Sequence, residues 1–161
     1  MKIIKYNIVT FAMAVTLAGC SASGTNYSVV QKANFKLEKS NSPYRLTLKN
    51  KSEDYSTYTL KPAGKIGDTI AESSPTLLRD INKEIQLKCG FRHKELTEIR
   101  IVSYEQPEFH EVWVYKSKQS LMPKNQIALS VILIAYPDAG GTDIYLYGEC
   151  NPEPKEFTFQ V

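Results

Sequence analysis

The sequence predicts an α+β fold in which one main helix packs on an antiparallel sheet of about five strands. Three observations lead to this prediction. Apolar residues recur at three- and four-residue steps near residues 74–90, as in an amphipathic helix. Several short segments alternate apolar and polar residues, as half-buried strands do. Residues 127–136 are apolar at almost every position, which suits a central strand covered on both faces.

The predicted helix has clear signals at both ends. Ser74 can cap its amino terminus, and Pro75 suits the first helical position. Gly90 stands where a left-handed residue commonly ends a helix. Between these ends runs one apolar stripe, formed by Leu78, Ile81, Ile85 and Cys89. The stripe is expected to face the core.

The strand-like segments lie on both sides of this helix. The segments before it predict additional N-terminal strands, and they contain Phe35 and Leu37, then Tyr44, Leu46 and Leu48, then residues 55–60. The segments after it contain Ile99 and Ile101, Val112 and Val114, Ile144 and Leu146, and finally Phe157, Phe159 and Val161. The turn at 137–141 contains Pro137, Gly140 and Gly141.

The amino terminus has the three parts of an export signal. Lys2 and Lys5 make residues 1–7 basic, residues 8–16 are mostly apolar, and small residues follow. A transmembrane helix needs about 20 apolar residues to cross the hydrocarbon core. The apolar run is shorter, so we expect residues 1–19 to be a cleaved signal peptide.

Residues 17–20, Leu-Ala-Gly-Cys, resemble the lipobox of bacterial lipoprotein precursors. The resemblance covers the signal alone and implies that the Cys20 thiol receives a lipid anchor such as palmitate. It also implies cleavage before Cys20 and acylation of the new amino terminus. Two or more acyl chains give stable membrane anchoring, whereas one is marginal. The alternative is an ordinary cleaved signal followed by a chance cysteine.

The residues after Cys20 bear on location. Ser21 and Ala22 follow it, without the aspartate that tends to hold such lipoproteins at the inner membrane. This resemblance implies anchoring at the outer membrane with the domain in the periplasm; a Gram-positive origin would instead place the protein outside a single membrane. Residues 20–26 are small and polar and predict a short flexible tether. Residues 27–161 then form a single globular domain.

Cleavage would leave 142 of the 161 residues and remove two lysines but no acid. The mature chain would therefore carry 18 basic and 17 acidic residues, a formal charge of +1. A near-neutral domain lacks the electrostatic footprint of a nucleic-acid-binding protein. We expect no nucleic-acid partner.

Two cysteines remain once Cys20 is lipidated, namely Cys89 and Cys150. Two thiols in an oxidising compartment predict one disulfide. A closed loop of about 60 residues would stabilise the fold by roughly 4 kcal/mol through the reduced entropy of the unfolded chain. The alternative is two buried free thiols.

The sequence predicts no catalytic residues, no metal site and no cofactor besides the lipid on Cys20. Cys89 and His93 lie four residues apart, but Gly90 should end the helix between them, and the disulfide explains Cys89 better. Residues 108–111, Glu-Phe-His-Glu, offer too few ligands for a metal ion, and we expect an exposed turn there.

Aromatic side chains give the clearest sign of a binding surface. If Val112, Val114, Ile144 and Leu146 face the helix, strand alternation places four aromatic residues on the opposite face: Trp113, Tyr115, Tyr145 and Tyr147. Trp and Tyr are common at protein-binding hot spots because they combine a large apolar body with a polar tip. The alternative is that the N-terminal strands cover these aromatics as a second core.

These observations predict a non-enzymatic, lipid-anchored protein of the cell envelope. Its expected role is as a component or partner of an outer-membrane or periplasmic protein assembly. The alternative is a binding or inhibitory lipoprotein whose target is a soluble enzyme, a glycan or a peptidoglycan fragment.

Overall fold

The structure is a computed structural model that describes residues 22–118, 120–138 and 140–160. The expected signal peptide and Cys20 lie outside the described residues, so the predicted lipidation is not addressed by it. In chain order the helices and strands are α1 (Ala22–Lys39), β1 (Tyr44–Lys51), β2 (Tyr55–Pro62), β3 (Lys65–Ile66), α2 (Pro75–Cys89), β4 (Leu96–Glu105), β5 (Glu108–Lys116), β6 (Gln126–Ala135), β7 (Thr142–Tyr147) and β8 (Glu156–Gln160). Three short 3-10 turns, η1 (Ile70–Ser73), η2 (His93–Glu95) and η3 (Pro123–Asn125), complete the set.

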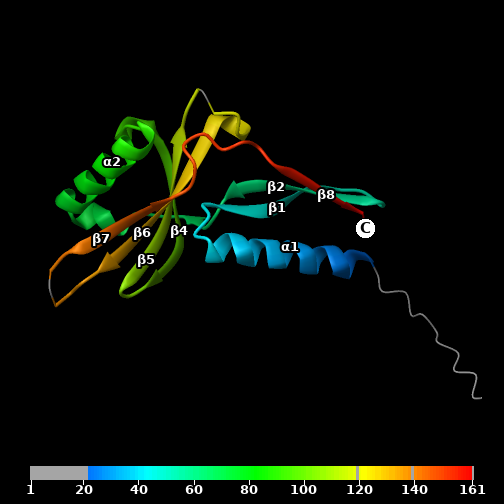
Figure 1. The fold of residues 1–161 in the computed structure, drawn as a ribbon, viewed down its shortest axis with the longest axis horizontal. Coiled ribbons are helices and arrows are strands. Elements are labelled where there is room, and N and C mark those ends of the chain that lie inside the picture. Colours follow the sequence, from blue (N-terminus) through cyan, green and yellow to red (C-terminus); the bar gives the residue numbers. More distant parts are fainter. Residues whose placement is uncertain (1–21, 119, 139, 161) are drawn as a thin grey trace, which may run out of the picture.

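The main sheet is antiparallel and has five strands in the order β3-β4-β5-β6-β7. Helix α2 lies across one of its faces (Figure 1). Strand β6, the long apolar run of the sequence, pairs with β5 on one side and β7 on the other. The predicted α+β architecture is therefore confirmed: one main helix packs on a five-stranded antiparallel sheet.

Helix α2 begins and ends as its sequence predicts. The Ser74 hydroxyl accepts a 3.4 Å hydrogen bond from the backbone N–H of Leu77, and Pro75 occupies the first turn. Gly90 ends the helix with φ 74°, and its N–H donates to Gln86 O at 2.8 Å. Ile81 and Ile85 are fully buried against the sheet, as the apolar stripe indicated.

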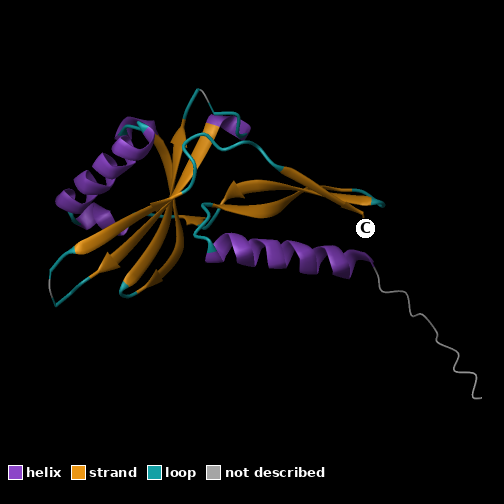
Figure 2. Cartoon of the chain, viewed as in Figure 1, coloured by secondary structure: helices purple, strands orange, loops and turns teal. Residues whose placement is uncertain are grey.

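A second sheet has three strands in the order β1-β2-β8. Strand β8, near the end of the chain, returns to pair with β2, so that Phe159 lies opposite Ser56. Figure 2 shows this sheet as a narrow extension beside the five-stranded sheet, with α1 running along it. The additional N-terminal strands β1 and β2 are confirmed.

The first helix corrects the strand expected at Phe35 and Leu37, since both residues belong to α1. The inward positions of α1 recur at helical spacing, namely Val30, Ala33, Asn34 and Leu37. Two alternating apolar residues are too few to separate a strand from such a stripe. Asn34 also fixes the helix to the edge of β1: its amide donates to Leu46 O at 3.0 Å and accepts from Leu46 N at 2.7 Å.

In place of the expected tether, residues 22–26 form the first turns of α1. Continuing a helix that already exists costs less free energy than starting one, so small polar residues next to a stable helix are readily drawn into it. Cys20 and Ser21 lie outside the described residues. Within the described ranges, neither α1 nor α2 is long and apolar enough to cross a membrane.

Two clusters of buried side chains hold the layers together. The larger fills the space between α2 and the five-stranded sheet, and it includes Ile81, Ile85 and Leu129. The smaller lies on the other face of that sheet, where Val112 and Val114 pack with Tyr44 of the second sheet. The five-stranded sheet is therefore covered on both faces around β5 and β6.

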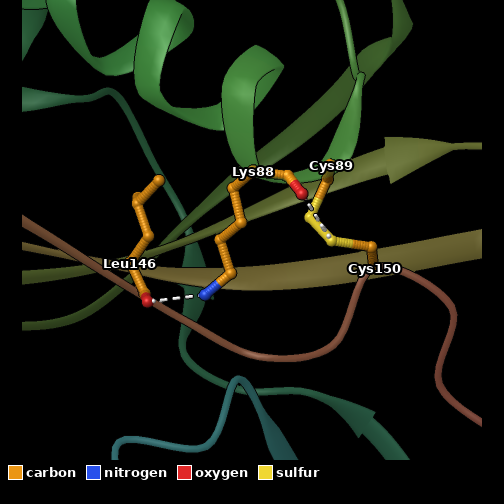
Figure 3. Close-up of a disulfide and its surroundings, with 4 residues drawn as sticks. All are labelled: Lys88, Cys89, Leu146 and Cys150. Carbon is orange, nitrogen blue, oxygen red and sulfur yellow. Dashed lines mark hydrogen bonds between the residues drawn. A yellow bond between two sulfur atoms is a disulfide. The ribbon is translucent and has the colours of Figure 1, made fainter.

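The disulfide joins Cys89, the last residue of α2, to Cys150, which follows β7 (Figure 3). The two Cα atoms lie 5.2 Å apart, and 61 positions separate the residues in sequence. The predicted pairing of Cys89 with Cys150 is confirmed. The bond attaches the carboxyl end of the helix to the segment that leaves the edge of the sheet.

Candidate functional site

The four aromatic residues predicted to form one surface lie on two different faces. Trp113 and Tyr115 are fully buried in the cluster beneath α2, and Tyr115 stacks on Phe91 with ring centroids 5.1 Å apart. Tyr145 and Tyr147 lie on the face away from α2 and are 42% and 37% exposed. The prediction of one shared aromatic face is therefore wrong.

The pairing register explains this outcome. Trp113 lies opposite Leu129, whereas Val112 lies opposite Ser130, which in turn lies opposite Tyr147. Side chains directly opposite each other share a face. The wide space under α2 takes the large rings, while Val112 and Val114 meet the small side chains Ala63 and Ala128 beside the second sheet. The alternation of side chains within β5 was predicted correctly. Trp113 and Tyr115 face the helix, however, where Val112 and Val114 were expected to do so.

Tyr145 and Tyr147 belong to a group of polar aromatics along β7. The Tyr136 hydroxyl donates to Asp143 Oδ2 at 3.0 Å, and the Tyr145 hydroxyl donates to the same oxygen at 3.3 Å. The hydrogen bond to Asp143 raises the pKa of Tyr136, and the negative charge of Asp143 raises that of Tyr145. Both hydroxyls thus remain protonated donors at neutral pH. Tyr136 is 44% exposed, so two part-exposed tyrosines share one carboxylate, and Tyr147 lies further along the same strand.

The backbone of β7 is unpaired on its outer side. Strand β7 is the last strand of its sheet, and it pairs with β6 alone. Tyr136 N donates to Gly141 O at 3.0 Å, which makes residues 143, 145 and 147 the hydrogen-bonded partners of β6. The N–H and C=O groups of Thr142, Ile144 and Leu146 therefore point outward. We call these backbone groups, together with the side chains of Tyr136, Asp143, Tyr145 and Tyr147, the β7 edge.

One end of the β7 edge is tied to α2. Lys88 Nζ donates to Leu146 O at 2.8 Å, close to the disulfide (Figure 3). Cys150 Sγ lies 3.3 Å from the carbonyl oxygen of Lys88. This bond occupies one of the outward backbone carbonyl groups of β7. The disulfide and Lys88 hold the edge in place while the backbone groups of Ile144 stay open.

The residues considered for catalysis do not come together. Cys89 is bonded to Cys150, so its sulfur is not a free nucleophile. His93 Nδ1 lies 3.2 Å from Asn82 Oδ1. Across the described ranges, no group of three or more His, Cys, Asp or Glu side chains is placed to hold a metal ion. The geometry gives no support to a thiol or metal mechanism at these positions.

The segment 108–111 corrects the exposed turn expected there, because it begins β5 and its last two residues, His110 and Glu111, are buried. His110 and Glu111 point to opposite faces of the sheet, as neighbours on a strand do. His110 Nε2 lies 3.0 Å from Ser130 Oγ. Burial, and next the positive charge of Arg45, lower the pKa of His110. The imidazole is therefore neutral at neutral pH.

Glu111 forms a buried hydrogen-bond network that sequence reasoning missed. Its carboxylate accepts hydrogen bonds from Thr69 Oγ1, Ile70 N, Tyr104 Oη and Trp113 Nε1, at 2.7, 2.9, 2.7 and 2.7 Å. Glu111 is fully buried. The network attaches the segment before α2 to the sheet, so its role is structural. The spacing of Glu111 and Trp113 by two residues was the available signal, since such residues share a face of a strand.

Comparison of the chain with known protein families, with curated proteins and with solved structures finds no match. Functional inference therefore rests on the chemistry of the chain itself. The β7 edge is the surface that combines exposed aromatic side chains, a carboxylate and unpaired backbone groups.

Proposed function

We propose that this chain is a lipid-anchored protein of the cell envelope that binds another protein and does not act as an enzyme. The observation that carries the proposal is the β7 edge, where part-exposed tyrosines border an unpaired strand. An exposed edge strand is a template for a strand of another chain, and natural proteins usually protect such edges. An edge that stays open beside tyrosines is suited to a partner.

The mode of binding that fits this surface is strand addition. In this mode an extended segment of the partner hydrogen-bonds to the outward N–H and C=O groups of Ile144, extending the sheet by one strand. Tyr145 and Tyr147 project on one side of that added strand and supply apolar contact area with hydroxyl groups at the tips. Backbone bonds would give affinity, and the tyrosines would give specificity.

The location in the proposal rests on the lipobox resemblance at Cys20. Anchoring at the outer membrane, with the domain in the periplasm, would keep the β7 edge near membrane-bound assemblies. Cys20→Ser removes the acceptor for the lipid. We expect this variant to leave the membrane fraction and to lose incorporation of labelled palmitate. Continued full membrane association of the variant would contradict the anchor.

The partner surface is tested with a double variant, Tyr145→Lys and Tyr147→Lys. Lysine on an edge strand opposes pairing with another strand, and both positions are part-exposed, so the fold should persist. Tyr55→Lys is the matched control, because Tyr55 is a 51% exposed tyrosine of β2 in the other sheet. We expect the double variant to recover far less partner in affinity purification from native cells. Equal loss with Tyr55→Lys, or no loss, would contradict the proposal.

A further inference from the structure

A groove of about 500 Å³ lies at the junction between the two sheets. Strand β2 contributes one wall, and β4 and η3 contribute the other. Tyr44 and Met122 are its most buried lining residues, at 7% and 5% exposure. Leu60 and Pro62 add further apolar surface. Its volume falls within the range of about 300–1,000 Å³ that is common for small-molecule sites.

The charges around this groove do not balance. Its two acids are already paired, Glu156 with Lys49 and Glu98 with Arg100. Arg100 also donates to Gly64 O at 2.7 Å. The two remaining cations are exposed and, among the described residues, form no ion pair: Lys61 on β2 and Lys124 in η3. Two of the lysines that line the groove therefore carry positive charges that no described acid pairs with.

The backbone that carries Lys124 is held in an unusual conformation. Lys124 has φ 62° and ψ 17°, and the next residue, Asn125, has φ 55°. Residues other than glycine adopt this left-handed region at a cost in free energy, and such strain tends to occur at functional sites. Two backbone hydrogen bonds stabilise this turn. Asn125 N donates to Met122 O at 3.0 Å, and Ser117 N donates to Asn125 O at 2.9 Å. The turn thus places Lys124 next to Met122 in the groove.

The lining residues also indicate whether the main part of a ligand, apart from its charged group, should be polar or apolar. In the described part of the chain, the only buried polar side-chain atom without a hydrogen-bond partner is the Tyr115 hydroxyl, which lies in the core under α2. Apolar atoms make up the larger share of the groove's lining surface, and among the described residues none of its buried side-chain donors or acceptors is left unpaired. A hydrocarbon body suits such a lining, since apolar contact needs no matching polar group. Lysine ammonium groups are compact positive charges that attract an anionic head group.

We propose that this groove binds an anionic amphiphile of the fatty-acid type. The positive charges of Lys61 and Lys124 attract the carboxylate, and the hydrocarbon chain packs on Leu60, Pro62 and Met122. This binding site is separate from the β7 edge, because none of its lining residues belongs to β7. A failure of one proposal therefore leaves the other standing.

The ligand class is tested by calorimetric titration of the purified protein with dodecanoate, below the concentration at which dodecanoate forms micelles. Dodecyltrimethylammonium has the same hydrocarbon chain and the opposite head charge, and it serves as the matched ligand control. We expect saturable binding of dodecanoate at one site and none of the cationic amphiphile. Equal binding of both, or no saturable binding, would overturn the proposal. Binding of a hexaglutamate peptide in place of dodecanoate would also overturn it.

The position of the site is tested with the double variant Lys61→Glu and Lys124→Glu. We expect about tenfold weaker binding of dodecanoate, because two favourable charge contacts become unfavourable. Lys83→Glu on the exposed side of α2 is the matched control and should bind as the wild type does. Thr59→Trp, which fills the groove while keeping both lysines, should also lose binding. Unchanged binding by the double variant, with the fold verified by circular dichroism, would overturn the placement.

Discussion

Trp113 Nε1 donates a 2.7 Å hydrogen bond to Glu111 Oε2 in the interior of the protein, where both side chains are fully buried. The bond joins two residues of β5 that point toward α2. It belongs to a network of four donors, two of which come from the segment just before α2. The network links the position of α2 to the central strand.

Glu111→Ala should therefore be strongly destabilising. It leaves Thr69 Oγ1, Ile70 N and Trp113 Nε1 without their acceptor, whereas Tyr104 can still donate to Asp68 O. Each unsatisfied buried polar group costs roughly 1–3 kcal/mol, so we expect a total loss of about 3 kcal/mol or more. The measurement is the free energy of unfolding from urea denaturation. Glu108→Ala, at an exposed position of the same strand, is the control and should change it by less than about 0.5 kcal/mol. Similar effects of the two variants would show that the network contributes little.

Replacing tyrosine with phenylalanine should affect the stability of the fold differently at positions 115 and 104. The Tyr115 hydroxyl is buried without a partner, so Tyr115→Phe should leave stability unchanged or raise it by up to about 1 kcal/mol. The Tyr104 hydroxyl lies 2.7 Å from Glu111 Oε1 and 2.9 Å from Asp68 O. Tyr104→Phe should lower stability by about 1–2 kcal/mol. Thermal and urea unfolding of both variants would reveal the contrast, and a larger loss with Tyr115→Phe would contradict it.

The protein with its disulfide should have a much larger free energy of unfolding than a variant without it. Replacing Cys89 and Cys150 with alanine opens a loop of 61 residues and should lower the free energy of unfolding by about 4 kcal/mol. The loss arises mainly because the unfolded chain gains freedom. Peptide mapping without reductant should find the two cysteines linked. Two thiols that react with an alkylating reagent in the native protein would contradict the bond.

His110 predicts a loss of stability in mild acid. Its pKa is lowered in the folded protein, first by burial and next by the charge of Arg45, so the unfolded chain binds the proton more tightly. The contribution of neutral His110 is therefore complete above its unfolded pKa of about 6.5. It falls as the pH drops from that value toward the folded pKa. His110→Asn should show a smaller loss of unfolding free energy between pH 7.5 and pH 5 than the wild type.

His93 supplies the control for this pH dependence. It is exposed, and His93→Asn should keep the acid sensitivity of the wild type. If His110→Asn and the wild type lost the same free energy over this range, the sensitivity would come from other groups.

The sequence predicted those elements whose signals are local. Ser74, Pro75 and Gly90 define α2 within one stretch of chain, and the cysteines predicted their own pairing. Strand alternation correctly placed Trp113 and Tyr115 together. It could not predict which face meets the helix, because that depends on pairing between β5, β6 and β7. Tyr145 and Tyr147 consequently stayed in the candidate site, whereas the other two aromatics left it.

Long-range contacts account for the remaining differences. Strand β8 pairs with β2 across about a hundred residues, as Tyr58 opposite Phe157 shows, and no local pattern specifies that pairing. Helix α1 was mistaken for a strand because Phe35 and Leu37 alternate, while its contact with β1 runs through Asn34, a polar residue. The β7 edge likewise emerged only once the order of the strands was known.

The central claim is that the β7 edge binds a protein partner, and site-specific photo-cross-linking in native cells tests it most directly. A photoreactive phenylalanine derivative replaces Tyr145 in one strain and Tyr55, a somewhat more exposed tyrosine of the other sheet, in a second. We predict one defined cross-linked protein from position 145 and none from position 55. The absence of an adduct at 145, or the same adducts from both positions, would contradict the account.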